Sequence, residues 1–160
     1  MARSTIPATA DPDATDDMLA TQPIGYWSGV ANEMVIKRIR DAMARMDVTQ
    51  PQWWTLCRVD IGGDGPTREE VATQLASVAD GPYEISRAVD QLLHRGWLSA
   101  DAGRRLHLTD AGRAAKARIK QLVTDLRAEI HDGITDEEYV TALKVLRRMI
   151  HNLGGPATLR

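Results

Sequence analysis

Apolar residues recur at steps of three and four along most of this chain, which is the spacing of amphipathic helices. Such runs occupy residues 26–46, 51–61, 67–79, 83–95, 109–131 and 139–150. Breakers separate them, the clearest being GGDGP at residues 62–66 and DGP at residues 80–82. The pattern predicts six helices in a chain of 160 residues, which is long enough for one domain with an appended segment.

Start signals in the sequence support four of these helices, and for the sixth this signal is GITDEE at residues 133–138. Thr49 is placed to cap the second helix, with Pro51 in its first turn. Thr67 is followed three residues later by Glu70, which is the spacing of a capping box. Asp110 lies in the first turn of the fifth helix, where a negative charge suits the helix dipole. The local chemistry therefore agrees with the periodicity.

The stretch RGWLSADAGRRLHLTDAGR, residues 95–113, interrupts the helical pattern. It predicts two short strands, residues 97–100 and 104–108, around the turn DAG. The predicted fold class is therefore mainly α with a small β-hairpin. Because the two strands are adjacent, no parallel sheet is available to form a nucleotide-binding crevice.

Alternation within the second strand divides its side chains between two faces. Leu106 and Leu108 share one face and can pack on the helices, whereas Arg105 and His107 face outward. Arg104 lies at the tip, beside the turn. The hairpin is either a surface connection between two helices or a basic finger that lies on a phosphate backbone.

The helix at residues 83–95 has two chemically different sides. Its apolar side consists of Ile85, Ala88, Val89, Leu92 and Leu93. Its polar side carries groups that can read base edges or contact phosphates, namely Tyr83, Arg87, Asp90, Gln91 and His94. Two helices joined by a turn and followed by a hairpin describe a winged helix-turn-helix. An ordinary solvated face has a similar composition, so the polar side alone leaves both readings open.

The distribution of charge adds to this picture. The net charge of −2 argues against a uniformly basic nucleic-acid binder. Residues 1–33 nevertheless carry one Arg against five acids, while residues 84–120 carry eight Lys and Arg against four acids. The one clearly positive region of the chain therefore contains the predicted hairpin and the helix before it.

Residues 67–112 contain the stretches EEVATQLA, ISRAVDQLLHRGWLSA and RRLHLTDAGR. On these stretches, the region resembles the multiple antibiotic resistance regulator (MarR) family of bacterial transcription factors. It includes a Leu-Thr-x-x-Gly signature at the end of the wing, which Leu108, Thr109 and Gly112 match. Together with the long flanking helices it covers most of the chain. It implies a winged helix-turn-helix with long N- and C-terminal dimerisation helices.

Two features depart from the family pattern. The wing is several residues shorter than is usual, and only Asp101, Arg104 and Arg105 remain of its charged tip. The helix before the wing begins with DGPYE instead of small polar residues, so that Tyr83 and Glu84 stand where base contacts are expected. Both departures bear on how deeply the protein would enter the grooves of DNA.

The resemblance implies a homodimer that binds double-stranded DNA and is expected to act as a repressor. The expected DNA-binding residues are Thr67, Arg68, Tyr83, Ser86, Arg87, Asp90, His94, Arg104 and Arg105. The first two begin the third helix and are expected to touch phosphate. The last two belong to the wing, and the others lie on the helix that would enter the major groove.

These expectations divide the chain into three parts. Residues 1–22 are small, polar and acidic and form a disordered or loosely docked tail. Residues 47–109 form the winged helix-turn-helix lobe, and residues 23–46 and 110–153 form dimerisation helices. The outer helices hold more apolar residues than one small lobe can bury, although they could instead close one compact monomer. A symmetric dimer predicts a pseudo-palindromic operator.

By the same resemblance, a small aromatic or lipophilic effector binds between the dimerisation helices and the lobe and weakens DNA binding. The residues expected to line its pocket are Tyr26, Trp27, Met34, Trp53 and Trp54, although core packing is the simpler explanation for each. Cys57 is expected to be a core residue and not an oxidation sensor, because apolar neighbours would raise the pKa of its thiol.

The sequence also argues against several function classes. No Cys/His cluster has zinc-ligand spacing, and no phosphate loop or catalytic cluster is present, so we expect no metal, no cofactor and no enzymatic activity. We expect no membrane span and no signal peptide, and the single Cys indicates a reducing, cytoplasmic setting. The alternatives left open are a winged-helix protein-interaction module without operator binding and a small enzyme with an unrecognised helical site.

Overall fold

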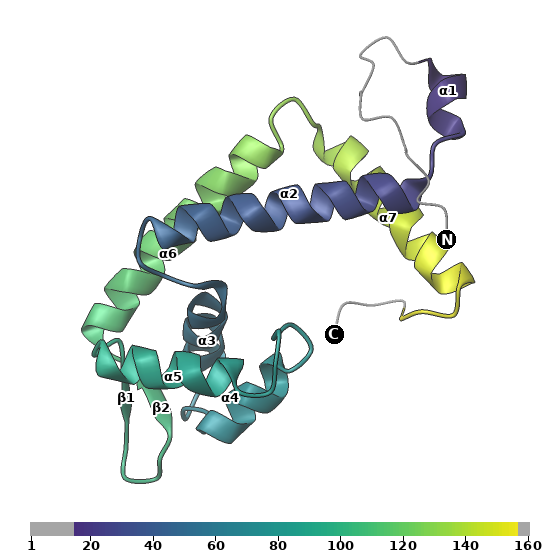
Figure 1. Ribbon diagram of the computed structural model, residues 1–160. Coiled ribbons are helices and arrows are strands. Elements are labelled where there is room, and N and C mark those ends of the chain that lie inside the picture. Colours follow the sequence, from purple (N-terminus) through teal and green to yellow (C-terminus); the bar gives the residue numbers. More distant parts are fainter. Residues whose placement is uncertain (1–14, 157–160) are drawn as a thin grey trace, which may run out of the picture. The chain divides into compact units, whose positions relative to one another are not determined.

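The computed structural model describes residues 15–156. Its elements, shown in Figure 1, are α1 Asp16–Ala20, α2 Ile24–Ala44, α3 Gln50–Ile61, α4 Arg68–Leu75, α5 Glu84–His94, β1 Leu98–Ala100, β2 Leu106–Leu108, α6 Asp110–Ile130 and α7 Asp136–Asn152. The predicted class, mainly α with one hairpin, is confirmed. The chain separates into two compact units, Met1–Ile36 and Lys37–Arg160.

The first unit holds α1 and the first part of α2. The indole Nε1 of Trp27 donates a hydrogen bond to Gln22 Oε1 at 2.5 Å, and the Tyr26 and Trp27 rings meet edge to face. Helix α1 lies within the segment expected to be a tail, and its first turn carries Asp16 and Asp17. Residues 1–14 of that expected tail lie outside the described residues.

Threonine caps begin four helices of the second unit, and the two predicted from local spacing are confirmed. Thr49 and Gln52 form a capping box at α3, and Thr67 and Glu70 form one at α4. Glu70 Oε2 accepts the Thr67 backbone N–H at 2.8 Å. Thr109 caps α6 and Thr135 caps α7. The third helix ends at Leu75, earlier than its apolar pattern predicts, and residues 76–78 form a turn instead.

The hydrophobic core of the second unit lies between α3, α4, α5, the hairpin and the first half of α6. Its fully or nearly fully enclosed side chains are Met43, Val48, Leu56, Val59, Val71, Leu75, Ile85, Val89, Leu92, Leu98, Leu106, Leu108 and Ile119. Each such side chain stabilises the fold by about 1.5–3 kcal/mol relative to leaving it exposed. The core therefore fixes α4, α5 and the hairpin as a winged helix-turn-helix (Figure 1).

The hairpin is antiparallel and pairs Leu98 with Leu108 and Ala100 with Leu106. Its strands are shorter than predicted, because residues 101–105 form the connection. The predicted alternation is confirmed, since Leu106 and Leu108 are buried and the residue between them is half-exposed.

The Leu-Thr-x-x-Gly signature has a geometric basis where the hairpin meets α6. The Thr109 hydroxyl accepts the Gly112 N–H at 3.0 Å and donates to the Gly96 carbonyl at 2.6 Å. This brings the Trp97 backbone so close that a Cβ on Gly112 would lie 1.9 Å from the Trp97 carbonyl oxygen. Only glycine allows this approach of hairpin and helix.

We expect the substitution Gly112→Ala to lower the free energy of unfolding by about 1–3 kcal/mol, because its methyl group would force the Trp97 backbone away. Denaturant unfolding at fixed protein concentration measures the change. Gly25→Ala in α2 is the matched control, since no atom lies within 4 Å of the added Cβ. The control should be neutral or stabilising by up to about 1 kcal/mol. Equal stability of both variants would refute the packing argument.

Helices α6 and α7 differ in how much of their apolar surface they bury. In α6, the residues Ala115, Ile119 and Leu126 are buried. In α7 no residue is buried, and its exposed large apolar side chains are Val140, Leu143, Val145, Met149 and Ile150. Helix α7 therefore carries an apolar surface that the described residues leave uncovered.

Candidate nucleic-acid interface

Helix α5 presents a polar side to solvent, as its periodicity predicts. Ile85, Ala88, Val89 and Leu92 are buried, and Leu93 is half-buried against the same core. On the opposite side Arg87, Asp90, Gln91 and His94 are exposed, and Tyr83, just before the helix, is 75% exposed. The core thus holds α5 by one side and leaves the other available to a partner.

Two of the expected contact residues bind each other. Arg68 Nη2 lies 2.6 Å from Asp90 Oδ1, and Arg68 Nη1 donates to the Ser86 carbonyl at 3.3 Å. The hydrogen bond from Arg68 holds the pKa of the Asp90 carboxyl below its usual range. Arg68 therefore braces α4 against α5, and the charges of the pair offset one another at the surface.

Other expected contact residues make no side-chain interaction within residues 15–156. These are Tyr83, Arg87 and His94, for which no hydrogen bond or ion pair of the side chain occurs in that part of the chain. The exposed guanidinium of Arg87 is consequently a positive group on the outer side of α5 with no acceptor of its own.

The two arginines of the hairpin have different surroundings. Arg104 is exposed at the tip, has a backbone φ of 61° and makes no side-chain interaction within the described chain. Arg105 is exposed, as expected, but its Nη1 donates a hydrogen bond to the Gly65 carbonyl at 2.6 Å. The sequence predicted DNA contact for both arginines, whereas the structure gives an internal acceptor to Arg105 alone among the described residues.

Asp101 organises the hairpin connection. Its Oδ1 accepts the Arg105 backbone N–H at 2.9 Å, and its Oδ2 lies 3.0 Å from His107 Nε2. The hydrogen bonds with His107 and with the Arg105 backbone hold the pKa of the Asp101 carboxyl below its usual range. The turn around Arg104 is therefore closed by its own side chains.

Further contacts hold α5 on the rest of the lobe, and periodicity gave no sign of them. The buried Gln52 donates from Nε2 to Gln91 Oε1 at 2.9 Å. Arg95, beyond the end of α5, donates to the Asp47 carbonyl at 2.5 Å and stacks on the Trp97 ring at 3.9 Å. Asp47 itself has a positive φ of 54°, which the sequence did not reveal.

The backbone of the chain is similar to several solved structures, although no family model matches its sequence. One is a mutant of E. coli MarR complexed with operator DNA, with a TM-score of 0.62, 22% identity and coverage of 85% of this chain and 99% of that one. The Mycobacterium tuberculosis MarR family protein Rv2887 in complex with DNA has a TM-score of 0.62, 19% identity and coverage of 84% and 99%. A mutant of S. aureus MepR has a TM-score of 0.67, 16% identity and coverage of 82% and 99%. The chain has the MarR winged-helix fold.

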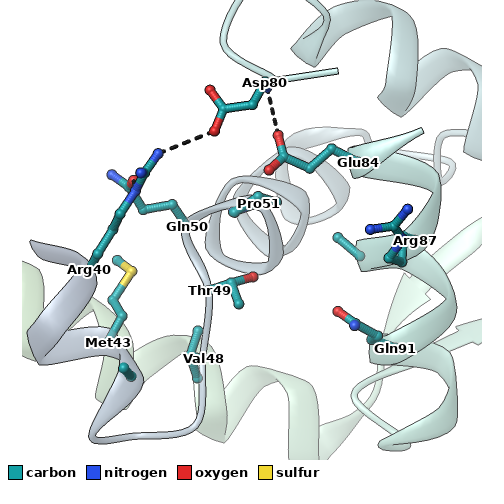
Figure 2. A pocket seen from close by; sticks show the side chains of 12 residues that line it. Arg40, Met43, Val48, Thr49, Gln50, Pro51, Asp80, Glu84, Arg87 and Gln91 are labelled. Atoms are coloured by element: carbon teal, nitrogen blue, oxygen red, sulfur yellow. Dashed lines mark hydrogen bonds and ion pairs between the residues drawn. The ribbon is translucent and has the colours of Figure 1, made fainter. Parts of the chain in front are cut away.

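Within this MarR fold, a cavity of about 510 Å³ lies beside α5 (Figure 2). Its lining residues are Arg40, Met43, Ala44, Val48, Thr49, Gln50, Pro51, Asp80, Glu84, Arg87, Ala88 and Gln91. Arg40 pairs with Asp80 at 3.3 Å across one side, and Glu84 accepts the Asp80 backbone N–H at 2.8 Å. Arg87 and Gln91 line the side formed by α5, so the cavity shares Arg87 with the candidate interface.

None of the five residues expected to form an effector pocket lines this cavity. Trp53 and Trp54 are half-buried against the core. Tyr26, Trp27 and Met34 belong to the first compact unit of the chain, whereas the cavity is lined by residues of the second. Met34 is 63% exposed.

Cys57 occupies a smaller recess of about 160 Å³, which it shares with Trp54, Arg58, Ile61 and Leu75. The thiol is half-buried, and burial raises its pKa, which disfavours the reactive thiolate. Among residues 15–156, His, Cys, Asp and Glu side chains form no cluster of three that could hold a metal ion. No helix in that range has the length and apolar character needed to cross a bilayer.

Proposed function

We propose that this chain is a MarR-type transcriptional regulator that binds DNA as a homodimer and represses transcription in the bacterial cytoplasm. The observation that carries the proposal is the position of two unpaired cations on the described lobe. Arg87 stands on the outer side of the second helix of the helix-turn-helix, and Arg104 stands at the tip of the hairpin. Proteins of this fold that are similar to the chain have been solved with DNA.

In the proposed complex, α5 enters the major groove with its outer side toward the base edges. Arg87 is the residue suited to a bidentate contact with guanine, and Tyr83, Ser86 and His94 supply further groups near bases or phosphates. Thr67 and the N-terminus of α4 face a phosphate. Arg68 and Asp90 approach the DNA as an ion pair. Arg104 enters the minor groove, whose negative potential attracts its guanidinium.

The homodimer is proposed because of the uncovered apolar side chains of α7. Monomeric proteins avoid large exposed apolar patches, whereas a second copy that packs on this surface removes it from water. Residues 23–46 and 110–153 are the proposed dimerisation helices, and residues 47–109 the DNA-binding lobe. A two-fold dimer would place its α5 helices on half-sites about one DNA turn apart, which implies a pseudo-palindromic operator.

A small aromatic or lipophilic effector is proposed to release the DNA. The cavity beside α5 suits this role because its floor is apolar, with Met43, Val48 and Ala88 buried, while Arg87 stands at its wall. A ligand that draws the Arg87 guanidinium to itself would remove that group from the DNA. Addition of such compounds to a preformed complex would show release as a fall in DNA binding.

Binding to the DNA upstream of the chain's own gene, measured at several salt concentrations, tests the proposed function. A specific dimer should prefer this DNA over a scrambled duplex and lose affinity linearly in log salt, with a slope of about one per phosphate contact. Binding without sequence preference, or no binding, would refute operator recognition and favour the alternative, a protein-interaction module on the same scaffold.

A further inference from the structure

We propose that Arg105 is a positioning residue of the hairpin, so that Arg104 is the only one of the two arginines that contacts DNA. This inference rests on the proposed function. Its first support is the 2.6 Å hydrogen bond from Arg105 Nη1 to the Gly65 carbonyl. The guanidinium is turned back toward the loop before α4, away from the tip that would meet a groove.

The backbone around Arg105 is joined to the same loop. Arg105 forms a β-bridge with Thr67, and the Leu106 N–H donates to the Pro66 carbonyl at 2.9 Å. Gly65 has φ +83°, and a Cβ there would lie 2.7 Å from His107 Cε1 and 2.8 Å from the Leu106 carbonyl oxygen. The loop and β2 therefore approach as closely as glycine allows, and the Arg105 side chain adds a charge-assisted hydrogen bond between them.

Further hydrogen bonds connect this contact between the loop and β2 to the turn that carries Arg104. Asp101 accepts the Arg105 N–H through Oδ1 and meets His107 through Oδ2, while the Arg104 N–H donates to the Asp101 carbonyl at 2.9 Å. These bonds hold Arg104 at φ 61°, a conformation that residues other than glycine seldom adopt without support. The tip is therefore ordered before it meets a partner.

Because Arg105 helps to order the hairpin tip before DNA binds, it affects DNA binding without contacting DNA itself. A tip that is already fixed does not lose conformational freedom when it binds, so its contacts contribute more to affinity. Removal of the Arg105 anchor would loosen the tip and weaken binding through Arg104. Removal of Arg104 would take away the phosphate contact itself.

Three variants separate these roles: Arg104→Ala, Arg105→Gln and the two combined. Arg104→Ala should lower operator affinity about tenfold and reduce the slope of log affinity against log salt by about one. Arg105→Gln should lower affinity about three- to tenfold with its slope unchanged, since no phosphate contact is lost. In the Arg104→Ala background, Arg105→Gln should have almost no further effect, because it acts through Arg104.

Hydrogen exchange of the hairpin gives a readout that does not depend on DNA. Arg105→Gln should speed exchange of the Leu106 amide while the global unfolding midpoint stays near that of the parent. The inference is overturned if Arg105→Gln reduces the salt slope by about one and adds fully to Arg104→Ala, or if Leu106 exchange is unchanged. If the parent binds no DNA, the proposed function fails and the exchange result alone decides the role of Arg105.

Discussion

Replacing Leu143 and Ile150 of α7 with glutamate is expected to dissociate the proposed dimer and to weaken operator binding by two to three orders of magnitude. Both side chains are more than two-fifths exposed, at 41% and 44%, and no residue of α7 is buried within the described chain. If a second copy covers this helix, the two carboxylates of each copy would be buried without partners, which costs several kcal/mol. Each monomer would then hold one half-site only.

Sedimentation velocity reports the loss of the dimer, and titration of fluorescent DNA with one or two half-sites reports its effect on binding. The variant should bind the two duplexes alike, whereas the parent should strongly prefer the longer one. A control with the same change in net charge is Thr141→Glu with Arg148→Gln, on the other side of α7. A Leu143 and Ile150 variant that still sediments as a dimer would exclude α7 from the interface.

The substitution Arg87→Ala is expected to lower operator affinity about ten- to a hundredfold and to change the sequence preference. The reason is that Arg87 is exposed on the outer side of α5 and has no acceptor among residues 15–156, so its donors remain available to a base. A bidentate contact with guanine distinguishes that base from the other three, unlike a contact with phosphate. The fold should be unaffected for the same reason, because no internal bond is broken.

Competition of operator variants, each with one base pair changed, measures the preference of the parent and of Arg87→Ala. The position read by Arg87 should become tolerant in the variant, while the others keep their discrimination. Arg58→Ala on α3 is the control, since it removes one half-exposed positive charge outside the proposed DNA contacts and the proposed dimerisation helices. If both variants weaken all duplexes equally, Arg87 contributes charge and not base recognition.

Local signals in the sequence predicted much of the fold. The cap at Thr49, the capping box at Thr67 and the alternation at Leu106 and Leu108 each involve residues within a few positions of one another. The apolar side of α5 was likewise readable from its period, because burial of that side is what holds the helix in place. Helix α1 was missed, since five residues carry too little periodicity to distinguish a helix from a tail.

The sequence did not show which charged side chains of the candidate interface bind one another. Arg68 and Asp90 were both expected to face DNA, yet they are 22 positions apart and pair only because α4 packs on α5. Alternation placed Arg105 on the outward face of the hairpin, but it gave no sign of the Gly65 carbonyl that accepts from its guanidinium. The cavity lined by Arg40, Asp80 and Arg87 joins three segments that no local pattern relates.

The sequence of this protein by itself thus determined the order of its elements, their caps and the apolar sides of its helices. These features depend on backbone propensity and on the spacing of residues over one or two helical turns. Only the tertiary structure decided which cations keep their donors available. A guanidinium takes whatever acceptor the packing brings within reach, and for Arg105 that acceptor is the Gly65 carbonyl, 40 residues away along the chain.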